Sequence, residues 1–263
     1  MGIVNVTPDS FSDGGVYGEA HAAAQHCEAL VRQGADILDI GGESSRPGAI
    51  QLSAQDEWQR IEPVLRAALG LGVPVSVDTC KVEVMRRALD VGVDIVNDIR
   101  ALSAPGAMEL LAAHGTAGVC LMHMRGDSAT MQGLTDYTDV VREVTLYLQQ
   151  RCNEAQRCGL AAERVVLDPG YGFAKTTQQN FELLRRQAEL LALGRPVLAG
   201  WSRKSSLGVV TGRPVEERLA ASLAAAVLAL EGGARILRVH DVAPTVDVVK
   251  VWLASHEVGA VTA

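Results

Sequence analysis

Eight short apolar segments alternate with helix-favouring segments along this 263-residue chain, and this alternation most constrains its fold. The first segment is Gly2 to Asn5, and a glycine stands just ahead of each of the other seven, where a preceding helix would end. These glycines are Gly34, Gly72, Gly92, Gly115, Gly159, Gly194 and Gly233. Strands that alternate with helices form parallel sheets, and continuous apolar strands are buried on both faces. Eight such units match a closed (β/α)8 barrel, so we predict one TIM-barrel domain over residues 1–263.

The expected elements follow from these glycines and from the apolar runs after them. The expected strands cover residues 2–5, 36–40, 74–78, 94–98, 118–123, 164–168, 196–200 and 236–240. The expected helices cover residues 21–33, 54–71, 81–91, 108–113, 136–158, 178–193, 216–230 and 245–254. An open doubly wound sheet is the alternative, but it needs a glycine-rich phosphate loop after its first strand. The segment Thr7-Pro-Asp-Ser-Phe11 supplies no such loop, so the closed barrel is favoured.

Composition excludes several classes of protein. The formal net charge of −7 argues against a nucleic-acid-binding surface. No apolar run is long enough to cross a bilayer, and no secretory signal pattern precedes the first strand. The five cysteines are odd in number and lack CxxC spacing, which favours reduced thiols over a disulfide framework or a zinc site. We therefore expect a cytoplasmic protein that binds neither nucleic acid nor a membrane.

Polar side chains stand where each expected strand finishes. They are Asn5, Asp39, Asp78, Asn97, Asp98, His123, Asp168, Ser202, Arg203, Lys204, Arg238 and His240. In a (β/α)8 barrel the carboxyl ends of the strands meet at one face, where barrel enzymes keep their active sites. Any single Asn or Asp is as readily explained as a turn residue, but a whole ring of buried polar groups needs a partner. The sequence therefore predicts a ligand cavity at this face.

The residue types favour a flat heterocycle with several N–H donors as the ligand. An ionised Asp can accept two parallel hydrogen bonds from a 2-amino-4-oxopyrimidine edge, and a Lys can donate to its carbonyl side. Arg238 and His240, with Arg46 from a loop, form an expected cationic group for a phosphate or a carboxylate. The residues alone thus indicate a planar ring together with an anionic leaving group or co-substrate.

Eight segments, in order along the chain, resemble those of the dihydropteroate synthase family, the folate-pathway enzymes that sulfonamides inhibit. They are Asn5-Val-Thr-Pro-Asp-Ser-Phe-Ser-Asp-Gly-Gly15, Asp39-Ile-Gly-Gly-Glu-Ser-Ser-Arg-Pro-Gly48, Ser76-Val-Asp-Thr79, Asn97-Asp-Ile99, Leu121-Met-His-Met124, Asp168-Pro-Gly-Tyr-Gly-Phe173, Ser202-Arg-Lys-Ser205 and Arg238-Val-His-Asp241. One such segment is a weak signal, but eight in register are highly specific. The resemblance implies condensation of 6-hydroxymethyl-7,8-dihydropterin pyrophosphate with p-aminobenzoate, which gives 7,8-dihydropteroate and pyrophosphate. It also implies Mg²⁺ as cofactor, sulfonamides as inhibitors and a homodimer.

The resemblance further implies roles for individual residues. The pterin would be bound by Asp78, Asn97, Ile99, Met122, Asp168, Phe173 and Lys204. The pyrophosphate would be held by Asn5, Arg238 and His240, and Asn5 would also be a ligand of Mg²⁺. The p-aminobenzoate and the loops that close over it would involve Phe11, Ser45, Arg46, Pro47 and Ser202, with Asp39 beside them. The catalytic residues would be Asp78, Lys204, Arg238 and His240.

The implied reaction is consistent with elementary chemistry. Loss of pyrophosphate leaves a carbocation on the pterin methylene, so an SN1-like path is plausible, and Asp78 is best placed to stabilise the positive charge. Closure of the loop over residues 7–15 would exclude water, which otherwise captures the cation. Trp201, where smaller residues are frequent in the family, either packs in the core or contacts the substrate.

Two other functions are compatible with a pterin-binding barrel. A methyltetrahydrofolate methyltransferase domain holds a pterin in a barrel, but it does not require the Ser202-Arg-Lys-Ser205 segment or the loops near residues 7–11 and 44–47. A catalytically inactive pterin-binding barrel would show losses among the strand-end residues, and none of these residues is lost. The synthase is therefore favoured over both.

Overall fold

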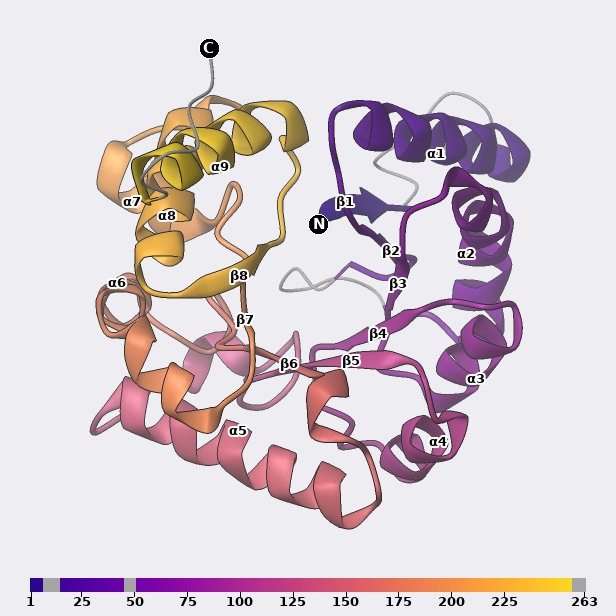
Figure 1. Cartoon of the computed structure of the whole chain (residues 1–263), viewed down its shortest axis with the longest axis horizontal. Coiled ribbons are helices and arrows are strands. Elements are labelled where there is room, and N and C mark those ends of the chain that lie inside the picture. The colour runs from indigo at the N-terminus through magenta and orange to yellow at the C-terminus, as the bar shows by residue number, and fades with distance from the viewer. Residues whose placement is uncertain (7–14, 45–50, 257–263) are drawn as a thin grey trace.

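The computed structural model of the chain describes residues 1–6, 15–44 and 51–256, which form a curled sheet of eight parallel strands (Figure 1). The strands are β1 (Gly2–Asn5), β2 (Leu38–Gly41), β3 (Val75–Asp78), β4 (Ile95–Asp98), β5 (Gly118–Met122), β6 (Val165–Asp168), β7 (Val197–Ala199) and β8 (Ala234–Leu237). They lie in chain order, and each neighbouring pair is parallel. The carboxyl ends of the strands therefore lie on the same side of the sheet.

Nine α-helices in these described ranges surround the curled sheet (Figure 1). They are α1 (Gly15–Arg32), α2 (Ala54–Ala68), α3 (Val82–Asp90), α4 (Ala107–His114), α5 (Val140–Arg157), α6 (Thr177–Arg185), α7 (Ser205–Thr211), α8 (Leu219–Glu231) and α9 (Val242–His256). At least one helix lies between each strand and the next, as a parallel sheet requires. Within the same ranges, no helix has both the length and the apolar character needed to cross a membrane.

The two edges of the sheet are joined by backbone hydrogen bonds just after β8. The Ile3 N–H donates to the Val239 carbonyl at 2.9 Å, and the Val239 N–H donates to the Met1 carbonyl at 3.0 Å. Gly2 and Val239 form an isolated parallel bridge at the same place. The curl of the sheet thus brings the residues that follow β8 against β1.

The glycines expected to end helices do so. All seven have a left-handed backbone, with φ between 64° at Gly194 and 100° at Gly92. A residue with a Cβ atom is disfavoured in this conformation, which commonly ends a helix. The prediction of seven helix stops, each just ahead of a strand, is therefore confirmed.

The last strand begins two residues earlier than expected. The sequence predicted a strand over residues 236–240, but β8 covers Ala234–Leu237. Gly233, with φ 86°, lies two residues after the end of α8, and Ala234 pairs at once with Val197 of β7. Arg238 and His240 consequently follow the strand instead of ending it.

The helices differ from expectation at several places: α1 begins at Gly15 instead of residue 21, and α9 at Val242 instead of residue 245. α5 begins at Val140 instead of near residue 136, because the Asp139 carboxylate accepts hydrogen bonds from the first turn. The helix expected over residues 178–193 is divided into α6 and a 3₁₀ helix over residues 187–193. The short helix α7, directly after Lys204, was not expected, since seven residues that include a glycine carry little helical signal.

The interior of the curled sheet and the layer under the helices are apolar. One side chain from each of seven strands is completely buried, and these are Val4, Ile40, Val77, Val96, Leu121, Leu167 and Leu198. Burial on both faces explains why the strands appear in the sequence as continuous apolar runs. The core therefore holds the strands in place, and the polar residues at their carboxyl ends are free to build a site.

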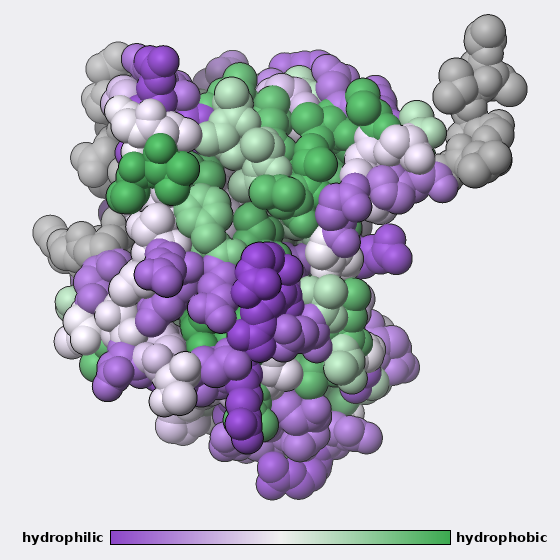
Figure 2. All heavy atoms as spheres, turned by 90° about the vertical axis from the view of Figure 1, so that its left-hand side faces the viewer, coloured by the Kyte–Doolittle hydropathy of each residue, from purple (hydrophilic) through white to green (hydrophobic). Residues whose placement is uncertain are grey.

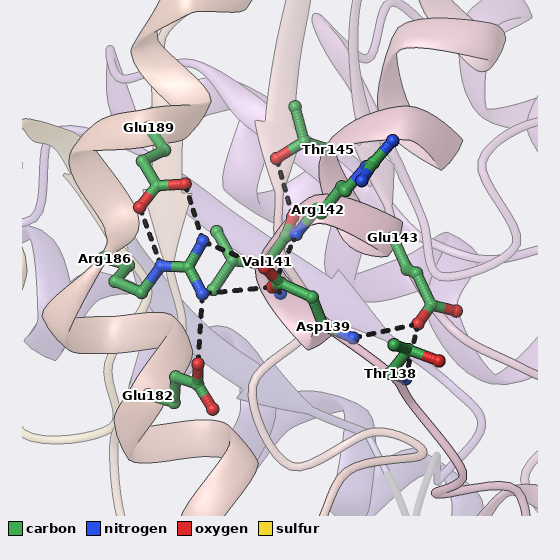
Figure 3. Close-up of polar contacts among 9 residues, drawn as sticks. All are labelled: Thr138, Asp139, Val141, Arg142, Glu143, Thr145, Glu182, Arg186 and Glu189. Carbon is green, nitrogen blue, oxygen red and sulfur yellow. Dashed lines mark hydrogen bonds and ion pairs between the residues drawn. The ribbon is translucent and has the colours of Figure 1, made fainter.

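Arg186 connects the start of α5 with the end of α6 (Figure 3). Its guanidinium donates to both oxygens of Asp139 at 3.1 and 3.2 Å, to both oxygens of Glu189 at 2.7 and 2.9 Å, and to Glu182 at 3.0 Å. Asp139 also caps α5 by accepting from the Val141 and Arg142 N–H groups. The same carboxylate therefore stabilises a helix end and a contact between two helices.

We predict that Asp139→Ala lowers the free energy of unfolding by about 1–2 kcal/mol, because it removes a helix cap as well as the partner of Arg186. Asp139→Asn is the matched control, since Asn caps helices about as well as Asp but carries no charge. Guanidinium unfolding curves should therefore show a smaller loss for Asn than for Ala. Equal losses in the two variants would contradict this account of the cap.

Candidate active site

Arg238 lies at the centre of the polar group formed by the strand ends. Its Nε donates to Asp39 Oδ2 and its Nη2 donates to Asp78 Oδ2, each at 2.6 Å. Asp39 comes from β2 and Asp78 from the end of β3, so Arg238 connects three parts of the sheet. Burial works against the charge of Arg238, but the two carboxylates outweigh it and raise its pKa. Arg238 is therefore a fixed cation at this face.

Asp39 is a buried member of this group that binds two of its other side chains. It is completely buried inside β2 instead of ending the strand, as had been expected. Its Oδ2 accepts from Arg238 and also from the Asn97 side-chain amide at 3.1 Å, whereas Oδ1 has no partner within the described part of the chain. Asp39 therefore orients two other residues of the predicted site.

Asp168 and Lys204 form the second half of the site. Asp168 ends β6, and its Oδ1 accepts from the Gly170 N–H at 2.7 Å. Burial raises the pKa of Asp168, while the Gly170 hydrogen bond and the charge of Lys204 oppose the shift. Burial lowers the pKa of Lys204 to about 8, opposed by the attraction of Asp168. The charges of the two side chains therefore influence each other within the site.

The apolar residues predicted around the pterin gather beside these charges. Met122 belongs to a small buried cluster with Met124, Met131 and Ala174, and Ile99 and Phe173 pack against it. The ammonium of Lys204 lies 4.2 Å from the centroid of the Phe173 ring, a cation–π contact. An apolar wall thus stands next to Asp168 and Lys204, as a flat heterocycle would require.

His240 and Ser202 are joined at the other side of Arg238. Both the backbone N–H and the Nδ1 atom of His240 lie near the Ser202 hydroxyl, at 3.1 and 3.0 Å. Burial, together with the charges of Arg203 and Arg238, lowers the pKa of His240 to about 4. The sequence grouped His240 with the cations of the site, but an imidazole with this pKa carries no charge at pH 7 and offers an N–H donor instead.

The remaining predicted residues divide into those near the site and those elsewhere. Asn5 ends β1 with an exposed side chain. Asp98 turns away and accepts from the Arg100 and Leu102 N–H groups, each at 2.8 Å. Trp201 is buried against Tyr171 and Phe181, which supports its interpretation as a packing residue. Four predicted residues lie outside the described ranges, namely Phe11, Ser45, Arg46 and Pro47.

Two buried residues that hold the loop after β6, Lys175 in the loop and Asn180 on α6, were not predicted from the sequence. Lys175 and Asn180 are 5% and 1% exposed, and both bind the backbone of residues 170–173. A lysine seven residues after a strand-end Asp gives no sign of burial in the sequence. His123, which was expected in the cavity, is instead buried next to Lys175, with 3.0 Å between its Nδ1 atom and Nζ.

The residues of the site are compatible with a magnesium ion that takes most of its ligands from water and from a phosphate-containing substrate. The described ranges contain no group of three or more His, Cys, Asp or Glu residues that could bind a metal. Mg²⁺ commonly keeps several waters and uses only one or two protein oxygens together with phosphate oxygens. The exposed amide of Asn5 offers one such oxygen, and the unpartnered Oδ1 of Asp39 shows that a carboxylate oxygen in this region lacks a donor.

Two neutral histidines make stability depend on pH. Burial lowers the pKa of His123 to about 2 and that of His240 to about 4, against 6.5 in the unfolded chain. Between these values and pH 6.5 the unfolded chain binds more protons than the folded protein. The free energy of unfolding should therefore fall as pH decreases from about 6.5 towards 4.

We predict that His240→Gln reduces this slope between pH 4.5 and 6.5 by up to about 1.4 kcal/mol per pH unit, the value for one proton. Urea unfolding at several pH values, with wild type and variant side by side, measures the difference. Because carboxyl groups contribute equally to both proteins, only the difference between the slopes counts. Identical slopes would show that His240 titrates normally in the folded protein.

Comparison with known proteins agrees with the geometry of the site. Residues 1–240 match the family described as pterin binding enzyme. The dihydropteroate synthase of Neisseria meningitidis serogroup B is 52% identical over 260 residues, which are 97% of this chain and 91% of that protein.

Two solved structures are similar over nearly the whole fold. The structure of Xanthomonas albilineans dihydropteroate synthase with 4-aminobenzoic acid has a TM-score of 0.93 at 48% identity, and covers 98% of this chain and 93% of its own. The Yersinia pestis dihydropteroate synthase in complex with a sulfonamide drug has a TM-score of 0.92 at 42% identity, with coverage of 97% and 93%. The similarity therefore extends over both halves of the site.

Proposed function

The chain belongs to the pterin-binding enzyme family, and we propose that it catalyses the dihydropteroate synthase reaction. In this reaction the amino nitrogen of p-aminobenzoate bonds to the methylene carbon of 6-hydroxymethyl-7,8-dihydropterin pyrophosphate. The bond from that carbon to the pyrophosphate oxygen breaks, and the amine loses a proton. The observation that carries the proposal is the Lys204 ammonium over the ring of Phe173, in the electrostatic field of the buried Asp168.

We propose that the pterin lies between these residues and Asn97. Asp168 accepts two N–H groups from the amino-pyrimidine edge, and Lys204 donates to the carbonyl edge. Met122, Ile99 and Phe173 supply the apolar wall described above. One N–H of the Asn97 amide donates to Asp39, which orients the amide and leaves its side-chain oxygen and its second N–H for the ligand.

We propose that the leaving pyrophosphate lies between Asn5, Arg238 and His240. The two hydrogen bonds of Arg238 use Nε and Nη2, and within the described part of the chain Nη1 has no partner. The neutral His240 contributes an N–H donor instead of a charge. Asn5 would offer an oxygen to Mg²⁺, and the bound ion would supply positive charge that stabilises the leaving group.

Departure of pyrophosphate leaves positive charge on the pterin methylene, and we propose that Asp78 stabilises this charge. Asp78 is fixed by Arg238 at 2.6 Å, so its carboxylate does not reorient during the reaction. Preorganised charge of this kind is the commonest large contribution to catalysis. The aniline nitrogen is already neutral at pH 7, so no strong general base is needed.

We propose that p-aminobenzoate, and sulfonamides in its place, lie against Ser202 and Lys204 under the loops that contain Phe11, Ser45, Arg46 and Pro47. The sulfonamide complex of the Yersinia pestis relative supports this choice of ligand. The hydroxyl of Ser202 is held in place by the backbone N–H of His240. Ser202 is therefore a fixed wall of the proposed aminobenzoate site.

We further propose that residues 1–263 form a single closed (β/α)8 barrel in a cytoplasmic enzyme. The hydrogen bonds between Val239 and residues 1 and 3 support closure, since they join the two edges of the curled sheet. The order of the strands is the order of a TIM barrel, and the proposed site lies at the carboxyl ends of the strands.

We also propose that the protein is a homodimer through the helices α7 to α9. Figure 2 shows apolar side chains gathered on this side of the molecule. Val210 on α7, Leu228 on α8 and Val251 on α9 are 65%, 54% and 71% exposed, and a groove of about 520 Å³ lies between α8 and α9. Single-chain proteins rarely leave such a face uncovered, and the same face of a second copy covers it most simply.

We predict that Leu228→Glu shifts the protein from twice its chain mass of 27.8 kDa to the single mass. A charge buried in an apolar contact is strongly unfavourable. Sedimentation equilibrium measures the mass, and Leu146→Glu on α5 is the matched control, because Leu146 is 58% exposed on a different helix. A wild-type protein that sediments as a monomer at micromolar concentration would refute the proposed dimer.

We predict that the purified protein releases pyrophosphate only when both substrates and Mg²⁺ are present, and that a sulfonamide competes with p-aminobenzoate. A coupled pyrophosphate assay measures both effects. No release under these conditions would sink the proposed reaction. Methyl transfer from methyltetrahydrofolate, measured in the same preparation, would instead indicate the methyltransferase.

Variants at the pterin site serve as controls for this assay. Asp168→Asn keeps the size of the side chain but loses the charge that accepts two hydrogen bonds, so calorimetry should detect no pterin binding at concentrations that saturate the wild type. Far-ultraviolet dichroism should stay unchanged. Wild-type affinity for the pterin would show that Asp168 does not bind it.

A further inference from the structure

Lys175 is a buried lysine whose three N–H groups all point at uncharged acceptors. Its Nζ lies 3.0 Å from His123 Nδ1, 2.9 Å from the Gly170 carbonyl and 3.0 Å from the Phe173 carbonyl. The pKa of His123 is lowered by burial to about 2, so its imidazole is neutral and Nδ1 can accept. Burial lowers the pKa of Lys175 to about 7, and in its protonated form the three contacts use all three N–H donors, so none is left for a substrate. Lys175 therefore makes its hydrogen bonds to other residues of the protein and none to a substrate.

The backbone that Lys175 binds belongs to a loop that needs support. Between β6 and α6, Gly170, Gly172 and Ala174 all have left-handed φ values, of 71°, 82° and 50°. For Ala174 this conformation is unfavourable in itself. A Cβ atom at Gly170 would lie 2.0 Å from the His123 carbonyl oxygen, so the loop packs directly on the end of β5.

The two carbonyl groups that Lys175 binds lie next to the residues proposed to bind the pterin. The peptide N–H of Gly170 donates to Asp168 Oδ1, while the carbonyl of the same residue accepts from Lys175. The carbonyl of Phe173 accepts from Lys175, while its ring lies against the ammonium of Lys204. One buried ammonium thus fixes the neighbours of both Asp168 and Lys204.

A second buried side chain connects the same loop to the segment that carries Lys204. The Asn180 Oδ1 accepts from the Gly172 N–H at 2.8 Å, and its Nδ2 donates to the Ser206 hydroxyl at 3.1 Å. Ser206 lies in the first turn of α7, two residues after Lys204. Hydrogen bonds of Asn180 therefore connect the loop after β6 to the start of α7.

We propose that Lys175, paired with neutral His123, is a positioning residue for pterin binding: it fixes Gly170 and Phe173, and through them Asp168 and Lys204. The proposal rests on the proposed function for the identity of the ligand. It assigns Lys175 no contact with the substrate, which distinguishes it from Lys204.

The test is Lys175→Met, which keeps the length and apolar stem of the side chain, with His123→Phe as a second variant that keeps a ring but cannot accept. We expect the KM for the pterin substrate to rise by about ten-fold or more in each, the effect of one misplaced charge-assisted hydrogen bond. The KM for p-aminobenzoate should rise less than the KM for the pterin, because only one of its two proposed contacts, Lys204, depends on this loop, whereas Ser202 is held by His240.

A double-variant cycle separates positioning from general damage to the fold. If Lys175 and His123 act as a pair, the double variant should raise the pterin KM no more than Lys175→Met alone. If the two substitutions instead caused independent structural defects, their fold-changes in the pterin KM would multiply in the double variant. A folded Lys175→Met protein with wild-type pterin KM, or fully multiplicative effects in the double variant, would overturn the proposal. If Lys175→Met does not fold, the outcome with His123→Phe decides.

Two readouts do not depend on synthase activity. Nitrogen-15 spectra of His123 should show the tautomer with the proton on Nε2 from pH 5 to 9, and the Nδ1 signal should shift in Lys175→Met. Calorimetry with the dihydropterin alone should show the weaker binding directly. Absence of turnover in the wild type would refute the proposed reaction, whereas an unchanged Nδ1 signal and unchanged dihydropterin affinity would refute the role of Lys175.

Discussion

The structure of the site depends on the buried contact between Asp39 and Arg238. These residues are 199 positions apart, and their 2.6 Å hydrogen bond joins β2 to the segment after β8. Placing a fully buried carboxylate next to a guanidinium costs desolvation energy, and apolar residues of similar size would often be as stable. The arrangement is therefore better explained by what it orients. Asp39 holds the Arg238 guanidinium so that it also donates to Asp78, and the same carboxylate oxygen of Asp39 orients the side-chain amide of Asn97.

Asp39 and Lys175 have the same relation to the two halves of the site. Each is almost completely buried, and each uses its charge on other parts of the protein. Asp39 sets Arg238 and Asn97, while Lys175 holds the backbone beside Asp168 and Phe173. Residues that bind a ligand with well-defined geometry need such support, because a side chain that can rotate loses part of its binding energy to ordering. The site is thus built in two layers, with charged side chains in both.

The sequence contains the order of the elements but not the contacts between them. Gly34 and the other helix-ending glycines are local signals, so the eight strands and most helices could be predicted. The polar strand ends were likewise readable, because parallel strands must finish at one face. Asp39 was expected at a strand end, but its burial and its partner Arg238 were not, since no residue near it in the chain indicates that contact. Lys175 was missed for the same reason, and the neutral state of His240 depends on burial and on Arg203 and Arg238, which only the folded structure brings together.

The balance of charge in the site fits the proposed reaction better than a site for anions alone. Three carboxyl groups, those of Asp39, Asp78 and Asp168, face Arg238 and Lys204, and burial raises the pKa of Asp78 to about 7 against the opposing charge of Arg238. A pyrophosphate group gains little from a guanidinium that already binds two carboxylates, so the proposed reaction assigns the missing positive charge to Mg²⁺. The same excess of carboxylate favours a cation on the pterin methylene. A site with this balance would stabilise the separation of charge that pyrophosphate departure creates, because the carboxyl group of Asp78 favours the cation and a bound Mg²⁺ would favour the anion.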